Sequence, residues 1–198
     1  QLEVLIPETA SRAVVLYAPT WRDGALDPAI PSADEATALR AVLAEAGAVL
    51  LIRSHPLGAG DYGALLGTHV RMLGSDVVAD VTPLLPAVDA LVTDYSSLAF
   101  DAALVPVPTL FLAPDLADYA RTRGFYGTYA DVAGSDAAGD WTVLTAQLGS
   151  VLSDHEERER RVGAARALSA RLHAFDDGEN TARVYRAIQA RLAAERRS

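Results

Sequence analysis

The chain contains no cysteine and no lysine. Without cysteine, disulfide bonds, cysteine-based metal sites and cysteine nucleophiles are all excluded. Because every one of its 17 Lys or Arg positions is an arginine, any cluster that binds phosphate must use guanidinium groups with planar, forked donors. The formal net charge of −9 argues against broad, sequence-independent binding to nucleic acid, since such binding needs an excess of basic residues.

Long apolar runs are also missing, although 51% of the residues are hydrophobic. None approaches the roughly 18 to 20 residues that a membrane span requires. The chain has neither a starting methionine nor a basic, then apolar leader, so no signal peptide is visible at Gln1. No Walker loop, Gly-rich dinucleotide fingerprint or Gly-x-Ser-x-Gly elbow occurs. These absences favour a cytoplasmic protein that uses none of those nucleotide or hydrolase motifs, and 198 residues predict one domain, 1–198.

Short apolar runs alternate with helix-like periods from Val14 onward. This alternation predicts an α/β fold, a Rossmann-like parallel sheet with helices on both faces, closed by C-terminal helices. We expect strands over 14–18, 49–53, 70–73, 90–93 and 109–112. We expect helices over 32–46, 61–66, 83–88, 97–104, 116–122, 141–152, 154–174 and 181–195.

Local signals refine some of these elements. Ser32 and Glu35 have the spacing of a capping box, and Gly47 is placed to end the helix that they begin. Pro86 predicts that helix 83–88 is brief or irregular. Residues 115–138 are rich in Gly, Asp and Tyr and predict an irregular surface segment, while the alternating charges of 156–161 predict a solvated helix face.

The stretch 91–100, LVTDYSSLAF, joins an apolar strand to a serine pair that opens a helix. Serine hydroxyls, free backbone N–H groups and the positive end of a helix dipole favour an anionic group there, so Ser96 and Ser97 are candidate phosphate ligands. Two further segments, 17–23 (YAPTWRD) and 52–56 (IRSHP), also place polar groups after apolar strands. In a parallel sheet these strand ends share one edge, where α/β proteins bind ligands. The alternative for the serines is an ordinary helix N-cap.

His55 is the candidate catalytic residue, because Pro56 keeps the backbone extended and holds the imidazole at this edge. It can donate to a phosphate oxygen or act as a general acid on a departing nucleotide. The alternative is a packed histidine that donates to a loop carbonyl. No converging set of metal ligands appears around Asp94 or Asp101, so we predict no metal site.

Arginines near the strand ends are the candidate partners of the phosphate groups. Arg22 can reach a diphosphate from the loop after the first strand, and its alternative role is a salt bridge to Asp23. Arg53 can do the same or simply pair with a carboxylate, because it can point to either face. Thr20, Thr93 and Asp94 are expected to support the site, with Asp94 orienting its turn through the backbone.

Five segments taken in order resemble the CDP-glycerol glycerophosphotransferase family, the teichoic-acid primases and polymerases and their capsule-forming relatives. They are YAPTWRD at 17–23, IRSHP at 52–56, DVTPLL at 80–85, DALVTDYSSLAFD at 89–101 and APDLADYARTRGFY at 113–126. A weaker match at 175–184, FDDGENTARV, resembles the closing helix region of the family. Each segment alone is modest, but five at family-like spacing are specific.

The resemblance implies the C-terminal, donor-binding half of a glycosyltransferase-B type enzyme whose N-terminal acceptor domain is absent from this chain. Such an enzyme moves glycerol phosphate from CDP-glycerol to a hydroxyl of a membrane-linked polyol-phosphate or glycan acceptor at the inner face of the cell membrane, and releases CMP. It implies that His55 contacts the diphosphate and helps CMP leave, and that Ser96 and Ser97 hold phosphate. Arg22 and Arg123 match basic positions and become further phosphate contacts. No cofactor is implied.

The chain departs from the family pattern at three places. Ser54 replaces a proline between Arg53 and His55, residues after Tyr129 lack a Pro-Gly-Pro-like element, and Pro86 interrupts a smoother helix. Two other functions stay open. One is a glycosyltransferase with another nucleotide-linked donor, such as a CMP-linked sugar. The other is a non-catalytic nucleotide-binding module that acts through the loop 131–140 and the C-terminal helices.

Overall fold

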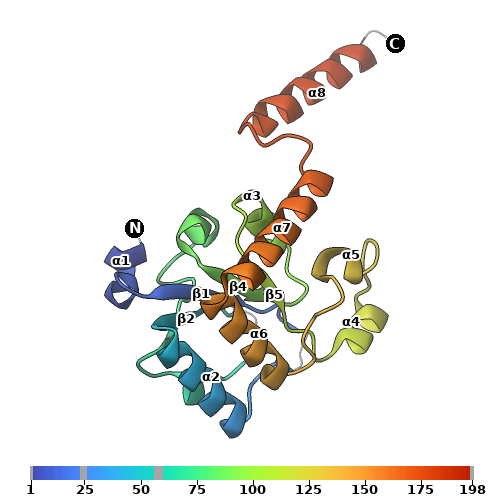
Figure 1. Cartoon of the computed structure of the whole chain (residues 1–198). Coiled ribbons are helices and arrows are strands. Elements are labelled where there is room, and N and C mark those ends of the chain that lie inside the picture. Colours follow the sequence, from blue (N-terminus) through green and yellow to red (C-terminus); the bar gives the residue numbers. More distant parts are fainter. Residues whose placement is uncertain (1, 23–25, 56–59, 197–198) are drawn as a thin grey trace.

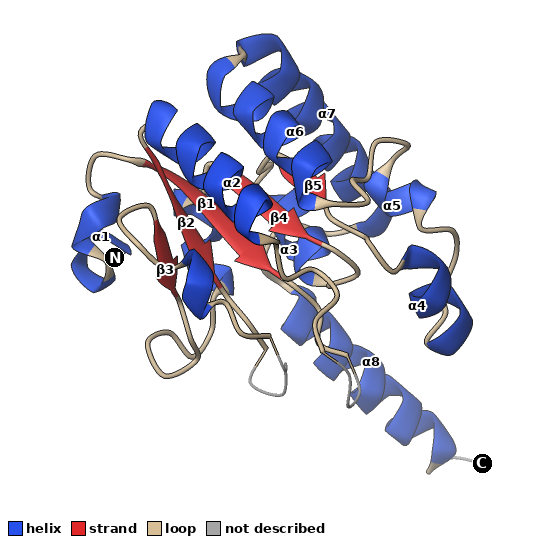
Figure 2. Cartoon of the chain, turned by 90° about the horizontal axis from the view of Figure 1, so that it is seen from below, coloured by secondary structure: helices blue, strands red, loops and turns tan. Residues whose placement is uncertain are grey.

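Five parallel strands form one sheet in the order β3-β2-β1-β4-β5 in the computed structural model of the chain (Figures 1 and 2). The structure describes residues 2–22, 26–55 and 60–196. The strands are β1 (Ala13–Ala18), β2 (Ala48–Ile52), β3 (Val70–Met72), β4 (Ala90–Thr93) and β5 (Thr109–Phe111). The chain leaves β1 for β2 and β3 on one side and returns to β4 and β5 on the other. This Rossmann-like order confirms the predicted fold class and places a switch point between β1 and β4.

Helices cover both faces of the sheet (Figure 2). The longer helices are α2 (Ala33–Glu45), α6 (Trp141–Ser153), α7 (His155–Leu172) and α8 (Asn180–Glu195). The shorter ones are α1 (Leu2–Leu5), α3 (Leu98–Leu104), α4 (Leu116–Thr122) and α5 (Ala130–Ala133). The 3₁₀ helices are η1 (Pro7–Thr9), η2 (Gly63–Leu65) and the longer η3 (Thr82–Ala87). Pro86 lies inside η3, which is brief and irregular as predicted.

Successive side chains of a strand point to opposite faces, and β1 shows how this builds two cores. Val15 and Tyr17 lie in the core on the side of α2 and α6, whereas Leu16 lies in the core on the side of α3 and η3. Strands β1, β2 and β4 are almost wholly buried, because helices cover both of their faces. This double burial explains why they read as continuous apolar runs in the sequence.

Helix α2 begins with the predicted capping box. The Ser32 hydroxyl accepts from the Glu35 N–H at 3.3 Å, and the Ser32 N–H donates to the Glu35 carboxylate at 2.8 Å. Past the end of the helix, Gly47 has a φ of 59°, the left-handed conformation that glycine adopts without steric cost.

Replacing Ser32 by Ala is expected to lower the free energy of unfolding by about 1 kcal/mol, because an N–H at the start of α2 loses its acceptor. Urea unfolding followed by circular dichroism measures the change. Ser150→Ala is the matched control, since that exposed hydroxyl donates to Ala146 O inside α6 and caps no helix. Equal stabilities of the two variants would contradict a role for the cap.

Two expectations about the second half of the chain hold for most of their residues but not for all of them. The segment 115–138 contains α5 in addition to the expected α4, and Ala133 and Ala138 are buried rather than at the surface. Arg161, expected on a solvated face, is only 5% exposed. Its guanidinium donates to Glu157, Asp136 and the Thr109 carbonyl, so it ties α7 to β5. Charge alternation alone does not reveal such long-range partners.

Helix α8 extends away from the sheet in Figure 1 and contains no buried residue. Its apolar side chains Val184, Ile188 and Leu192 are about half exposed, at 59%, 52% and 45%. Among the helices of the described part of the chain, none combines the length and apolar character needed to cross a membrane.

Candidate functional site

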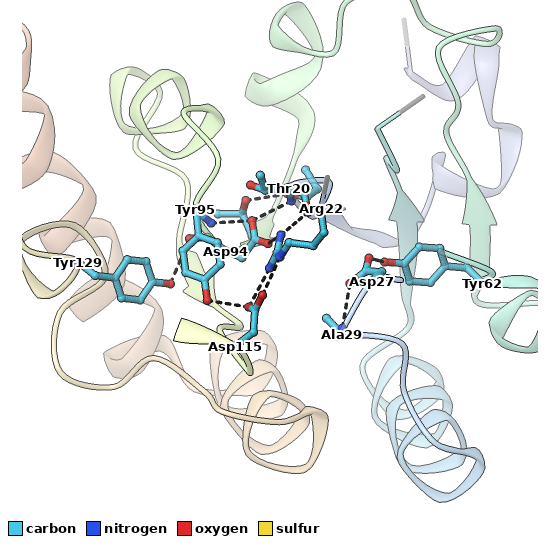
Figure 3. A network of polar contacts seen from close by, with 11 residues as sticks. Thr20, Arg22, Asp27, Ala29, Tyr62, Asp94, Tyr95, Asp115 and Tyr129 are labelled. Atoms are coloured by element: carbon cyan, nitrogen blue, oxygen red, sulfur yellow. Dashed lines mark hydrogen bonds and ion pairs between the residues drawn. The ribbon is translucent and has the colours of Figure 1, made fainter. Parts of the chain in front are cut away.

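The loops that follow β1 and β4 meet at the switch point of the sheet (Figure 3). The Thr93 hydroxyl, at the end of β4, donates to Ala18 O at the end of β1 over 2.7 Å. One residue further on, Asp94 is 4% exposed, and its Oδ1 accepts from the backbone N–H groups of Thr20 at 2.8 Å and Tyr95 at 2.6 Å. Asp94 therefore orients this turn with its side chain, whereas the sequence predicted a backbone role.

The guanidinium of Arg22 lies between two carboxylates (Figure 3). Its Nη1 donates to Asp94 at 3.1 Å, and its Nε and Nη2 donate to the two oxygens of Asp115 at 2.7 and 2.9 Å. Nη1 also donates to the backbone oxygen of Thr20. The Tyr95 hydroxyl donates to Asp115 at 2.9 Å. Asp115, in the loop after β5, therefore contacts both Arg22 in the loop after β1 and Tyr95 in the loop after β4. The alternative role considered for Arg22, a salt bridge to Asp23, cannot be placed, because Asp23 lies outside the described residues.

Burial and these contacts shift the pKa values of the cluster. Burial raises the pKa of Asp94 above its usual value, and the Thr20 N–H and the Arg22 charge oppose the shift without cancelling it. Burial acts in the same direction on Asp115, but hydrogen bonds from Arg22 and Tyr95 prevail and lower the pKa of that carboxyl. For Arg22, burial alone lowers the pKa, yet the hydrogen bonds to Asp115 and the Asp94 charge raise it overall. The guanidinium is therefore always charged.

A cavity of about 320 Å³ opens beside the serine pair. Its wall includes the two serines, Ser96 and Ser97, and the aromatic rings of Tyr119, Phe125 and Tyr129. Ser96 Oγ accepts from the Leu98 N–H at 3.2 Å, while the Ser97 side chain makes no capping bond and is exposed. The structure thus brings both predicted serines to one cavity, although Ser96 already satisfies one of the N–H groups at the start of α3.

Trp21 connects two other predicted site residues, His55 and Arg123. The imidazole of His55, after β2, stacks on the Trp21 ring with centroids 5.5 Å apart and planes inclined by 18°. The guanidinium carbon of Arg123, after α4, lies 5.3 Å from the centroid of the same ring. Arg123 precedes Gly124, which lines the cavity beside Ser97. His55 is exposed at this sheet edge and is not among the described residues that line the cavity.

Arg53 points elsewhere. Its guanidinium donates to the carbonyl oxygens of Leu73 at 3.2 Å, Ala79 at 3.0 Å and Val78. These bonds hold the loop after β3 against the end of β2, and they involve backbone carbonyls rather than the carboxylate considered above. A phosphate role for Arg53 stays a prediction that no contact in the structure supports.

Two further points concern Pro56 and a metal site. Pro56, expected to hold His55, lies outside the described residues. Within residues 2–22, 26–55 and 60–196, no group of three His, Asp or Glu side chains is arranged to hold a metal ion.

The sequence of residues 3–190 matches the model of the family described as CDP-Glycerol:Poly(glycerophosphate) glycerophosphotransferase. The chain belongs to this family. Among its curated relatives, the teichoic acid ribitol-phosphate primase of Bacillus spizizenii is 28% identical over 185 residues, which are 90% of this chain and 44% of the relative. The teichoic acid glycerol-phosphate transferase of Staphylococcus aureus is 30% identical over 187 residues, 89% of this chain and 45% of the relative.

Solved structures show the same fold. A variant of the wall teichoic acid polymerase TagF soaked with CDPG superposes with a TM-score of 0.72 at 24% identity, over 98% of this chain and 47% of that one. This chain therefore spans less than half the length of these relatives. Its relatives are teichoic acid polyol-phosphate transferases and polymerases, as the five sequence segments indicated.

Sequence reasoning missed Asp115, Trp21 and the tyrosines around the cavity. Asp94 directly follows β4, and Asp115 lies in the loop that follows β5, so the rule that polar residues after strand ends share an edge predicts its position. We expected instead that 115–138 was irregular surface. Trp21 stood inside a segment that carried the resemblance, but nothing in the sequence pairs it with His55.

Proposed function

We propose that this chain is the donor-binding part, a single domain over 1–198, of a polyol-phosphate transferase. It binds a CDP-linked polyol, and the full-length enzyme transfers glycerol phosphate or a similar polyol phosphate to a hydroxyl of a membrane-linked teichoic-acid or capsule acceptor. Membership of the glycerophosphotransferase family supports this proposal, as do relatives that act in teichoic acid synthesis. The acceptor is bound by an additional N-terminal half, in an enzyme located at the cytoplasmic face of the membrane.

The observation that carries the proposal is the meeting of Trp21, His55 and Arg123 at the edge that also presents the serine pair. These groups come from loops after β1, β2, α4 and β4, and they lie where parallel α/β sheets bind ligands. An imidazole, a guanidinium and two hydroxyls are the donors that a diphosphate requires in a chain without lysine. A 320 Å³ cavity beside the serines provides room for part of a small ligand.

The proposed reaction needs no covalent intermediate. The acceptor hydroxyl oxygen forms a bond to the phosphorus that carries the polyol, and the bond from that phosphorus to the bridging oxygen breaks. CMP leaves with the bonding electrons on that oxygen, and the acceptor hydroxyl releases its proton to water. In this scheme His55 protonates or hydrogen-bonds the departing phosphate, while Ser96, Ser97 and Arg123 stabilise its charge. We assign no cofactor to this step.

Calorimetric titration of this chain with CDP-glycerol and CDP tests the donor site. We expect saturable binding of both ligands, and a Ser96→Ala, Ser97→Ala double variant is expected to bind each about tenfold more weakly, because the phosphate loses two hydroxyl donors. Ser11→Ala is the matched control, since Ser11 is an exposed serine in the turn before β1, at the opposite end of that strand.

The absence of saturable binding at millimolar concentrations of either ligand would contradict the donor site. A panel with UDP and a CMP-linked sugar distinguishes the alternatives. Tighter binding of the CMP-linked sugar than of CDP-glycerol would favour a glycosyltransferase. Binding without turnover in the full-length enzyme would favour a non-catalytic module.

A further inference from the structure

Arg22 is enclosed by protein groups on nearly every side. Its side chain is 10% exposed, and those of Asp94 and Asp115 are 4% and 18% exposed. The guanidinium carbon lies 5.0 Å from the ring centroid of Tyr95 and 5.2 Å from that of Tyr119, and these two rings stack at 3.9 Å. Nε, Nη1 and Nη2 each donate to a protein oxygen. Little of the guanidinium remains for a ligand.

The charges of the cluster also disfavour a phosphate contact. One guanidinium faces two carboxylates, so the group carries a net negative charge when both carboxyls are ionised. An incoming diphosphate near Arg22 would meet the charges of Asp94 and Asp115 at short range in a partly buried site, where repulsion is weakly screened. A forked arginine that binds two carboxylates is instead a strong connector between the segments that carry them.

The segments connected in this way are the loops of the proposed donor site (Figure 3). Arg22 belongs to the loop after β1, Asp94 to the loop after β4, and Asp115 to the loop after β5. Asp94 is the residue from which the turn to Ser96 begins, and its backbone oxygen accepts from the Tyr129 hydroxyl at 3.1 Å. The position of the serine pair therefore depends on the same cluster.

We propose that Arg22 is a positioning residue rather than a phosphate ligand. Clamped by Asp94 and Asp115, it fixes the loops after β1, β4 and β5 relative to one another and so sets the place of Ser96 and Ser97. The proposal rests on the proposed donor site for its consequence on binding. The other consequence of the clamp, a rigid turn over 94–97, does not depend on any ligand.

Asp115→Asn distinguishes the two roles by the sign of its effect on CDP binding. If Arg22 positions the site, the loss of the forked ion pair weakens CDP binding about tenfold, even though a negative charge has been removed. If Arg22 itself contacts phosphate, the same substitution frees the guanidinium and removes repulsion, so binding stays equal or becomes tighter. Asp118→Asn is the matched control, because Asp118 pairs with Arg121 on exposed α4, 2.9 Å away, and touches no part of the clamp.

A double-mutant cycle adds a second readout. Arg22→Lys keeps the charge and loses the fork, and we expect it to weaken CDP binding about tenfold. Residues that act as one unit are not additive, so the double variant with Asp115→Asn is expected to lose about tenfold rather than a hundredfold. A hundredfold loss, or unchanged binding in Asp115→Asn beside weakened binding in Arg22→Lys, would overturn the proposal.

Hydrogen exchange of the amides of residues 95–98 tests the clamp without a ligand. We expect these amides to exchange about tenfold faster in Asp115→Asn than in the original chain, with core amides of β1 and β4 unchanged. Tyr95→Phe removes only the hydroxyl bond to Asp115 and serves if Asp115→Asn fails to fold. If the original chain does not bind CDP, the proposed donor site is wrong, and the exchange rates alone test the positioning role of Arg22. Unchanged exchange rates in both variants would overturn that role.

Discussion

Replacing His55 by Ala in the full-length enzyme is expected to lower turnover by about 10²- to 10⁴-fold, the usual contribution of a positioned general acid. The affinity for CDP is expected to fall far less, because the proposed donor site keeps the serine pair and Arg123 as phosphate ligands. The physical reason is that charge builds up on the departing CMP only as the bond breaks, so His55 acts mainly in the transition state. Steady-state kinetics and calorimetry measure the two effects separately.

His155→Ala is the matched control for this substitution. His155 is exposed at the first position of α7, and none of the described contacts connects it with the sheet edge. Its replacement is expected to leave turnover unchanged. If His55→Ala also leaves turnover unchanged, the imidazole merely packs on Trp21, which is the structural role that the sequence left open for it. Parallel losses in turnover and CDP affinity would instead assign His55 to ground-state binding.

Trp21 gives the position of His55 a physical basis. A tryptophan face attracts cations and stacks with planar rings, and here it holds both an imidazole and a guanidinium from distant loops. The sequence shows each of these residues in a separate segment, at positions 21, 55 and 123. Sequence reasoning placed His55 and the segment that contains Trp21 on one edge of the sheet, and Arg123 entered only through the family resemblance. The stacking that brings the three together depends on tertiary packing.

The fold was predictable because its signals are local. Strands buried on both faces appear in the sequence as apolar runs. The Ser32 and Glu35 pair indicates the start of α2, and Gly47 indicates its end. The partners of Arg22 were not predictable in this way, since Asp115 lies 93 residues further along the chain. The sequence suggested a local partner, Asp23, because that carboxylate directly follows Arg22 in the chain. Helix α5 was missed for a related reason, since a single turn flanked by glycine has no periodicity.

Replacing Trp141 by Ala is expected to lower the free energy of unfolding by about 3 to 5 kcal/mol, the range for deleting a large buried aromatic side chain. Trp141 is 2% exposed, and its ring lies edge-on to Tyr17 of β1 with centroids 5.1 Å apart. Its Nε1 donates to Ala29 O at 2.6 Å, so this side chain joins α6, the central strand and the loop before α2. Urea unfolding followed by far-ultraviolet circular dichroism measures the loss.

Trp141→Phe separates packing from hydrogen bonding. It retains an aromatic ring against Tyr17 but leaves the carbonyl of Ala29 without its donor, so we expect a loss of about 1 to 3 kcal/mol. Val143→Ala is the matched control, because that side chain lies in the same turn of α6 and is 45% exposed, and a change within about 0.5 kcal/mol is expected. Equal losses for Trp141→Ala and Val143→Ala would show that α6 is held to the sheet by its other apolar contacts. If the loss for Trp141→Phe lies between the other two, part of the stability comes from the hydrogen bond between Trp141 Nε1 and Ala29 O, which fixes the loop before α2.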